Sequence, residues 1–198
     1  MLKKSEKTKV LIRNAFIKLL NEKGLNDVSV KNITEELDIN RGTFYLHYED
    51  KYALLQEIEM DIINNIKSIL ENGAAYDLGR YILARDNDAL LNTLTEIYKY
   101  IKESSDIIGV LIGPNGDVSF QWKLKTLIEK TLEKNLESQS LDNTIAFKYM
   151  TVIASSAQLG IIQKWIKSDF QETPEELAIF MSELINEVFH KVLINHKQ

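Results

Sequence analysis

A run of four residues near the N-terminus carries side chains that can pair with the exposed edges of DNA bases. The run is Asn40, Arg41, Gly42 and Thr43. An arginine can donate two hydrogen bonds to guanine, and a threonine can contact a thymine methyl group or a hydrogen-bonding edge. Glycine costs a helix about 1 kcal/mol, and a close approach of the backbone to the bases would explain Gly42. We predict that Arg41, Gly42 and Thr43 approach bases.

The residues that follow separate into a buried pair and a set that can hold phosphate groups. Phe44 and Tyr48 are four positions apart, so on a helix they share one face and point toward a core. Tyr45, His47 and Lys51 then face outward, where their polar groups can hold phosphates on either side of a groove. Taken singly, each of these residues is more often ordinary solvated surface, so the prediction depends on the combination.

Two short helices must hold these side chains, and the sequence predicts both of them. Ser29 can cap the first helix. Asp38 stands where the chain has to turn sharply, and aspartate tolerates left-handed backbone better than most residues. Asn40 can cap the second helix, whose N-terminal residues would enter the major groove. The motif at about residues 29–48 is thus a helix-turn-helix, and Ser29 belongs to its predicted DNA-contacting set.

A third helix must support this pair, because helices so short are not stable alone. Residues 6–23 supply it with an apolar stripe at helical spacing, followed by Gly24, which suits the left-handed position after a helix. The stripe comprises Leu11, Ile12, Ala15, Phe16, Leu19 and Leu20. On the first short helix, the expected buried residues are Val30, Ile33 and Leu37.

The remainder of the chain also favours helix, so the predicted fold class is all-α. The 198 residues include 8 glycines and 2 prolines, and no run alternates with the period of a strand. Further helices are expected from Asp50 to about residue 70, and over 90–101, 119–136, 143–168 and 174–195. Residues 76–87 are left open. The last helix has a strong start signal in Thr173, Pro174 and Glu176.

Charge is distributed unevenly along the chain. The net charge is −5, yet residues 1–51 contain 10 Lys and Arg against 8 Asp and Glu and so carry +2. Residues 52–198 carry the remaining −7. A nucleic-acid surface is therefore expected in the first quarter of the chain, because the acidic remainder would repel phosphate.

The segment Gly42–Tyr48, with Lys51 after it and Val30 and Ile33 before it, resembles the signature of the TetR family of bacterial regulators. The resemblance covers about residues 6–66 and implies the same base and phosphate contacts as those predicted above. The chain differs from the family pattern at the turn, 37–40, where the family often has Ala-Gly-Val-Ser. It also has Leu46 where the family often has an aromatic residue or histidine, so the base preference stays open.

Two later segments, 112–120 and 165–176, are similar to a C-terminal domain of TetR-like regulators from Gram-positive bacteria, one branch of which regulates dihydroxyacetone kinase genes. The expected organisation is a three-helix DNA-binding domain at 1–66 and a helical domain for dimerisation and effector binding at 67–198. The resemblance implies a homodimer with a four-helix interface between the last two helices of each copy. Completion of a monomer core is the alternative for these helices.

The resemblance also implies a pocket for a small-molecule effector in the middle helices. The candidate pocket residues are Tyr98, Trp122, Tyr149 and Trp165. Plain core packing is the alternative for each of them. The candidate interface residues are Ala157, Gly160, Phe180, Leu184 and Val188.

Other classes of function fit the sequence less well. It has no cysteine, its 3 histidines lack metal-ligand spacing, and no phosphate-binding loop or nucleophile motif occurs, so we expect no enzyme, cofactor or metal. No apolar run reaches the roughly 18 residues of a membrane span. We expect a cytoplasmic, effector-responsive repressor that binds double-stranded DNA at a palindromic operator as a dimer. A coactivator working through protein contacts stays open, because the +2 charge of residues 1–51 is modest.

Overall fold

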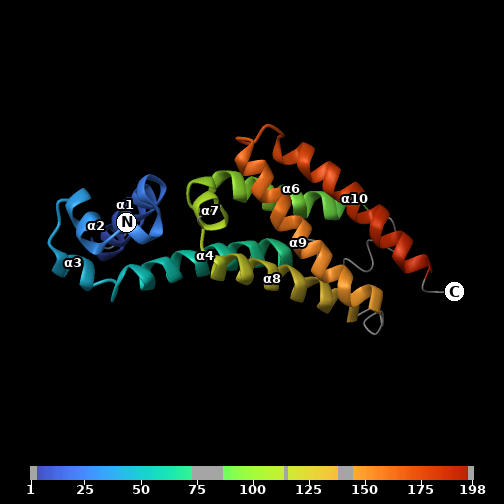
Figure 1. The fold of residues 1–198 in the computed structure, drawn as a ribbon, viewed down its shortest axis with the longest axis horizontal. Helices are drawn as coiled ribbons and strands as arrows, with labels where there is room; N and C mark the ends of the chain where they lie inside the picture. The colour runs from blue at the N-terminus through green and yellow to red at the C-terminus, as the bar shows by residue number, and fades with distance from the viewer. Residues whose placement is uncertain (1–3, 73–86, 114–115, 138–144, 196–198) are drawn as a thin grey trace. The chain divides into compact units, whose positions relative to one another are not determined.

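The computed structural model describes residues 4–72, 87–113, 116–137 and 145–195 (Figure 1). All regular secondary structure in these residues is α-helical, which confirms the predicted fold class. The helices are α1 (Lys4–Asp27), α2 (Val30–Glu36), α3 (Arg41–Tyr45), α4 (Lys51–Asn72), α6 (Asn87–Glu103), α7 (Ser105–Ile112), α8 (Val118–Glu137), α9 (Ile145–Lys167) and α10 (Pro174–Asn195).

The chain divides into two compact units. One comprises residues 1–62 and 106–120, and the other comprises residues 63–105 and 121–198. The first unit therefore contains the predicted helix-turn-helix together with a segment from the middle of the chain. The domain boundary after residue 66 stays a prediction. No helix in the described ranges is long and apolar enough to cross a membrane.

The first unit is built around an apolar core to which α1, α2, α3 and α4 all contribute. Its fully covered side chains include Ile12, Phe16, Ile33, Phe44, Leu54 and Ile58. Burial of each such side chain stabilises the fold by about 1.5–3 kcal/mol. Leu11 was expected on the same stripe but is 55% exposed. It lies at the edge of the face that Ile12 and Phe16 define, so the buried stripe is narrower than predicted.

Local capping groups begin the helices where the sequence predicted. Ser29 and Asn32 form a reciprocal capping box at the start of α2. The Asp50 Oδ1 accepts hydrogen bonds from the backbone N–H groups of residues 52 and 53, both at 2.8 Å, at the start of α4. Thr173 and Glu176 form the predicted box before α10, with the Thr173 N–H donating to Glu176 at 2.8 Å. These bonds satisfy N–H groups that have no partner within the helix.

One element of the first unit differs from the prediction. The helix α7 was not predicted, because a short apolar run cannot be assigned from its period alone. Its buried residues are Ile107, Ile108, Leu111 and Ile112. The Asn21 side chain of α1 donates a hydrogen bond to the Asp106 carbonyl at 2.7 Å, which joins α7 to α1. Gly24, predicted to follow the end of the first helix, has a non-helical φ of 75° and ψ of 165° and forms a kink in α1, after which a short helical stretch runs to Asp27. Residues 76–86, left open above, lie outside the described residues.

The second unit is centred on two buried aromatic rings. Tyr98 of α6 and Trp165 of α9 are 0% and 2% exposed, and their ring centroids lie 5.7 Å apart. The Trp165 indole N–H donates to the Glu172 carbonyl at 2.9 Å, which fixes the connection into α10. Helix α10 packs along α6, and a Lys99–Glu175 ion pair at 2.9 Å joins the two. Helix α9 leads into α10 through residues 168–173 (Figure 1).

Candidate nucleic-acid interface

The first turn of α3 presents the predicted base-reading residues to solvent. Asn40 precedes the helix, and its Oδ1 accepts a hydrogen bond from the Gly42 N–H at 2.8 Å. Arg41 and Gly42 are exposed, and Thr43 is half-buried. A Cβ at residue 42 would lie 3.3 Å from the Asn40 Oδ1, so a larger residue there would crowd the cap. The cap thus gives a second reason for Gly42, beside the predicted approach to bases.

The turn before α3 has the backbone conformation that the sequence predicted. Asp38 has a φ of 50°, and the Ile39 N–H donates to the Thr34 carbonyl at 3.0 Å. Ser29, at the start of α2, is exposed, but its hydroxyl lies 2.6 Å from the Asn32 Oδ1 within the capping box. A DNA contact by Ser29 stays a prediction, and it would have to share that hydroxyl.

The two sides of α3 divide into core and surface. Phe44 and Tyr48 are 0% and 5% exposed, and their ring centroids lie 5.8 Å apart. Tyr45 is 55% exposed, and His47 is half-buried. Leu46, which stands where the family often has an aromatic residue or histidine, is 83% exposed. An apolar side chain therefore occupies a surface position beside the predicted phosphate-contacting residues.

Lys51 has a different environment from the one predicted for a phosphate contact. Its ammonium group lies 2.8 Å from the Leu25 carbonyl, 2.6 Å from the Val28 carbonyl and 3.4 Å from the Asn26 carbonyl. These three acceptors match the three N–H donors of a lysine. They belong to the end of α1 and the loop that leads into α2. Lys51 thus fastens the start of α4 to the chain that precedes the helix-turn-helix.

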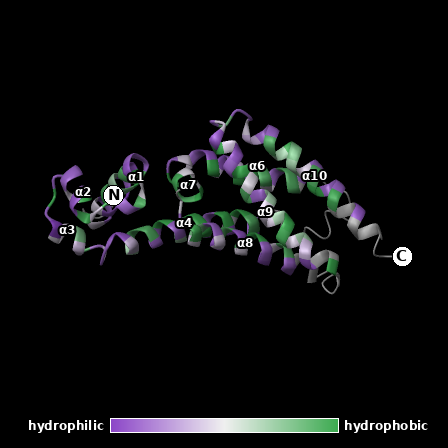
Figure 2. Ribbon diagram, in the orientation of Figure 1, coloured by the Kyte–Doolittle hydropathy of each residue, from purple (hydrophilic) through white to green (hydrophobic). Residues whose placement is uncertain are grey.

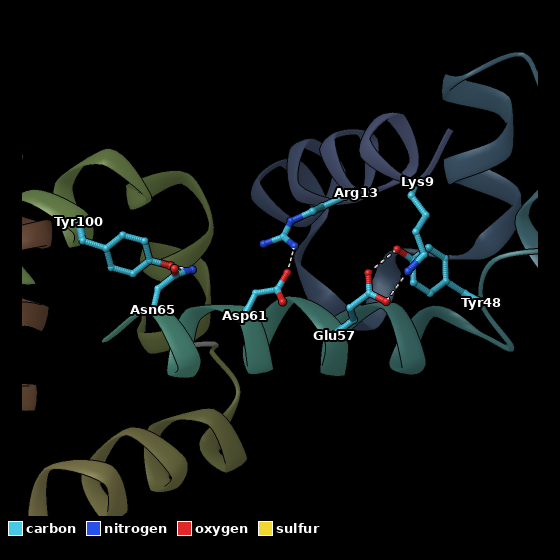
Figure 3. A network of polar contacts seen from close by, with 7 residues as sticks. All are labelled: Lys9, Arg13, Tyr48, Glu57, Asp61, Asn65 and Tyr100. Atoms are coloured by element: carbon cyan, nitrogen blue, oxygen red, sulfur yellow. Dashed lines mark hydrogen bonds and ion pairs between the residues drawn. The ribbon is translucent and has the colours of Figure 1, made fainter. Parts of the chain in front are cut away.

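A polar network joins α1, the end of the helix-turn-helix and α4 (Figure 3). Glu57 of α4 accepts a hydrogen bond from the Tyr48 hydroxyl on one oxygen and from Lys9 of α1 on the other, both at 2.8 Å. One turn further along, Arg13 pairs with Asp61. The Lys9–Glu57 pair and the Arg13–Asp61 pair each link residues that are 48 positions apart in the sequence. The only sequence signal for the network is that Lys9 and Arg13, like Glu57 and Asp61, are four residues apart.

The network shifts the acidity of two of its members. Burial works to raise the pKa of Glu57, but hydrogen bonds from Lys9 and Tyr48, with the charges of Lys9 and Arg13, outweigh it and hold that pKa below its ordinary value. Burial, and then the hydrogen bond to the Glu57 carboxylate, raise the pKa of the Tyr48 hydroxyl. Glu57 is therefore ionised and Tyr48 neutral at neutral pH.

The predicted pocket aromatics do not gather around one cavity. Trp122 and Tyr149 are 62% and 57% exposed, and Tyr98 and Trp165 pack against each other in the core. A cavity of about 190 Å³ does lie in the second unit, but none of these four residues lines it. Helical spacing predicts which residues share a face of a helix, but it does not predict what that face packs against. In this structure, mainly aliphatic residues line the cavity.

The predicted interface residues lie on α9 and α10. Phe180, Leu184 and Val188 of α10 are 56%, 41% and 43% exposed. Ala157 and Gly160 of α9 are exposed as well. In Figure 2, these two helices carry hydrophobic residues along much of their length, whereas α2 and α3 are mainly hydrophilic. Their role in contacting a second copy stays a prediction.

Two family models match the chain. Residues 12–58 match the model described as bacterial regulatory proteins, tetR family, and residues 88–187, about half of the chain, match the model described as transcriptional regulator C-terminal region. The chain belongs to the TetR family. The first match contains the whole of α2 and α3, so the TetR signature coincides with the exposed turn, the cap and the buried pair described above.

A curated relative is similar over a longer span. The HTH-type transcriptional regulator YuxN of Bacillus subtilis (strain 168) is 28% identical over 137 residues, which is 67% of this chain and 43% of YuxN. This TetR-family chain spans less than half the length of the curated relatives it matches.

Two solved structures share the fold. The TetR transcriptional regulator from Streptococcus agalactiae 2603V superimposes with a TM-score of 0.65 at 23% identity, covering 91% of this chain and 94% of that one. The dihydroxyacetone kinase operon activator DhaS superimposes with a TM-score of 0.59 at 18% identity, covering 93% of this chain and 97% of DhaS. At such identities the similarity concerns the fold alone.

Proposed function

We propose that this TetR-family chain is a DNA-binding transcriptional regulator, and that it acts as an effector-responsive repressor bound as a dimer to a palindromic operator. The exposed first turn of α3 carries the proposal. Its Arg41 is exposed, and in the described part of the chain it forms no ion pair. By contrast, Lys9 and Lys18 of α1 are paired with carboxylates at 2.8 and 2.6 Å. A guanidinium group at that position is available to fork onto guanine.

The remaining contacts follow from where the side chains lie. Arg41, Gly42 and Thr43 approach bases, with Asn40 at the cap. Tyr45 and His47 hold phosphates, and Ser29, which is exposed at the start of α2, completes the DNA-contacting set. The phosphate contact first predicted for Lys51 is revised: with its ammonium group on three carbonyls, this residue supports the interface by positioning α2 and α3.

A dimer is supported by the apolar surface of α9 and α10. Ile153 of α9 and Phe180 of α10 are 63% and 56% exposed, and several aliphatic neighbours on both helices are exposed too. Exposed apolar patches of this kind on a folded protein usually mark an interaction surface. A second copy of the chain would cover them by a two-fold arrangement and would place two α3 helices at half-sites about 34–36 Å apart, or a multiple of that.

Repression is the simplest output, because a dimer on a promoter obstructs polymerase without further contacts. A cytoplasmic location accords with that role. The similarity to DhaS supports a relation to the dihydroxyacetone kinase regulator-like branch only at the level of the fold, and it carries no information on the regulated genes.

DNA binding is tested by fluorescence anisotropy with the region upstream of the chain's own gene, over a range of salt concentrations. We expect specific binding with a steep negative slope of log K against log salt, because a dimer releases counterions from several phosphates. A coactivator acting through protein contacts is the second candidate, supported by the modest charge of +2 on residues 1–51. Absence of specific binding at about 100 mM salt, with the protein folded and dimeric, would favour the coactivator.

A further inference from the structure

A cavity in the second unit has walls from α4, α6, α8, α9 and α10 and a volume of about 190 Å³. Its deep wall is formed by aliphatic side chains that are at most 7% exposed, among them Leu94, Ile97, Ile101, Leu124 and Ile162. Ile153 and Leu184 also line it and are 63% and 41% exposed, so the cavity has a mouth as well as a floor. A small molecule can therefore enter a single copy of the chain from solvent and lie against buried aliphatic residues; in the proposed dimer, this mouth faces the second copy.

The lining of the cavity excludes charged ligands. None of the described residues that line it is charged, and only Thr93, Thr131 and Gln158 are polar. The Thr131 hydroxyl already donates to the Leu127 carbonyl at 2.8 Å. A carboxylate or an ammonium group would lose its hydration in this space and find no opposite charge, which carries a large free-energy cost. The ligand must therefore be neutral where it meets these walls.

Gln158 supplies a fixed polar group at the wall. Its Nε2 lies 2.9 Å from the Tyr98 hydroxyl, and its Oε1 lies 3.3 Å from the same oxygen. Tyr98 is fully covered and packs on Trp165, so it holds the amide in place. A primary amide has two donor hydrogens and two acceptor positions. The two hydrogen bonds with Tyr98 use one donor hydrogen and one acceptor position of the Gln158 amide, and they leave one of each for a neutral hydroxyl or carbonyl group.

We propose that this cavity binds an uncharged, mainly apolar molecule that carries one hydroxyl or carbonyl group, with Gln158 as the residue that selects the neutral head group. The inference rests on the proposed function, since it names the class of effector. An apolar cavity of about 150 Å³ in another protein holds benzene. The present cavity is somewhat larger, so a chain of about eight carbons is the matching size.

The test measures binding of three probes to the full-length protein by calorimetry and by methyl-group NMR shifts. The probes are 1-octanol, octanoate and octylammonium, which share a chain and differ in the charge of the head group. We expect 1-octanol to bind about tenfold more tightly than either ion. Binding of octanoate or octylammonium as tight as that of 1-octanol, or no saturable binding of 1-octanol, overturns the proposal.

Two variants locate the probe. Ala154→Phe fills the cavity and should abolish binding of 1-octanol, whereas Asn92→Phe, an exposed position on α6 that does not line it, should leave binding unchanged. Gln158→Glu should shift the preference from 1-octanol toward octylammonium by about tenfold. If Gln158 has only a structural role, Gln158→Glu should change the binding of all three probes by the same factor. That outcome would overturn the assignment of Gln158 as the residue that selects the head group. Circular dichroism checks that each variant is folded.

These measurements do not involve DNA, so the two proposals fail separately. Operator binding without selective 1-octanol binding overturns the ligand class and leaves the regulator intact. Selective 1-octanol binding by a protein that binds no DNA would contradict the proposed function and support the cavity assignment.

Discussion

The Tyr48 hydroxyl lies 2.8 Å from a carboxylate oxygen of Glu57, and the other oxygen of that carboxylate lies 2.8 Å from the Lys9 ammonium. One side chain of α4 therefore bonds to both the residue that closes the helix-turn-helix and the helix that supports it. Since Tyr48 is 5% exposed and also packs on Phe44, the bond fixes the orientation of α3 from the inside of the unit. The exposed residues of α3 need not be held by contacts of their own.

The Glu57 carboxylate should make the stability of the protein depend on pH. The pKa of Glu57 in the folded chain is below the ordinary value of 4.5. Its contribution to the free energy of unfolding is therefore complete above pH 4.5 and is lost as the pH falls through the pKa of the folded state. We expect Glu57→Gln to lower the free energy of unfolding at about pH 7 and to have less effect near pH 4. Urea unfolding at several pH values measures this. An effect of the same size at both ends of the range would show that the carboxylate charge is not involved.

Replacing Lys51 should destabilise the fold before it affects DNA contacts. Lys51→Met leaves three carbonyls without their charged donor, and hydrogen bonds of this kind contribute about 1.5–3 kcal/mol. The matched control is Lys67→Met, because Lys67 forms an exposed pair with Glu71 at 3.7 Å, and such pairs contribute little to stability. Denaturant unfolding compares the two variants. If Lys51→Met is as stable as the wild type and its DNA binding depends less steeply on salt, Lys51 contacts phosphate as first predicted.

Arg41 should determine sequence preference rather than general affinity. Arg41→Ala removes a side chain that can bond twice to one guanine, and we expect a loss of about 1–3 kcal/mol on the operator with relaxed preference at one base pair. Arg41→Lys keeps the charge but not the fork, so it should retain non-specific affinity and lose most of the preference. Fluorescence anisotropy with operator DNA and with scrambled DNA measures sequence preference and non-specific affinity separately. Equal losses of binding free energy on both DNA sequences would show that Arg41 contacts the phosphate backbone of the DNA and not the bases.

The apolar face of α10 should determine the oligomeric state. Phe180→Glu places a charge on a surface that is 56% exposed in one copy, and we expect the variant to have the 22.8 kDa mass of a single chain by light scattering. The wild type should have about twice that mass. Trp122→Glu is the control, because Trp122 is 62% exposed but lies on α8. A wild type that is itself monomeric at micromolar concentration would contradict the dimer.

The features that could be predicted from the sequence are local ones. Ser29 with Asn32, Asn40 before α3 and Thr173 with Glu176 are caps whose partners lie within three residues, and the strained backbone of Asp38 follows from the turn itself. Residue type and spacing are enough to specify such geometry. The same holds for Phe44, whose burial follows from the helical period.

The features that were missed depend on contacts between distant segments. Lys9 and Glu57 are 48 residues apart, and the carbonyls that hold Lys51 lie 23 to 26 residues before it. A lysine that bonds to carbonyls has the same sequence signature as one that bonds to phosphates. The aromatic residues predicted for a pocket do not line the described cavity for a related reason, since the exposure of Trp122 is decided by how α8 lies among its neighbours.

The burial of Trp165 has a practical consequence. The chain has 2 tryptophans, of which Trp165 is 2% exposed and Trp122 is 62% exposed. An indole in a covered, hydrogen-bonded site emits at shorter wavelength than one in water and is shielded from iodide. The unmodified protein therefore contains a built-in optical probe of its second unit: iodide should quench the red-shifted emission of Trp122 first, and later loss of the protected fraction would report the loosening of α6 and α9 around Trp165.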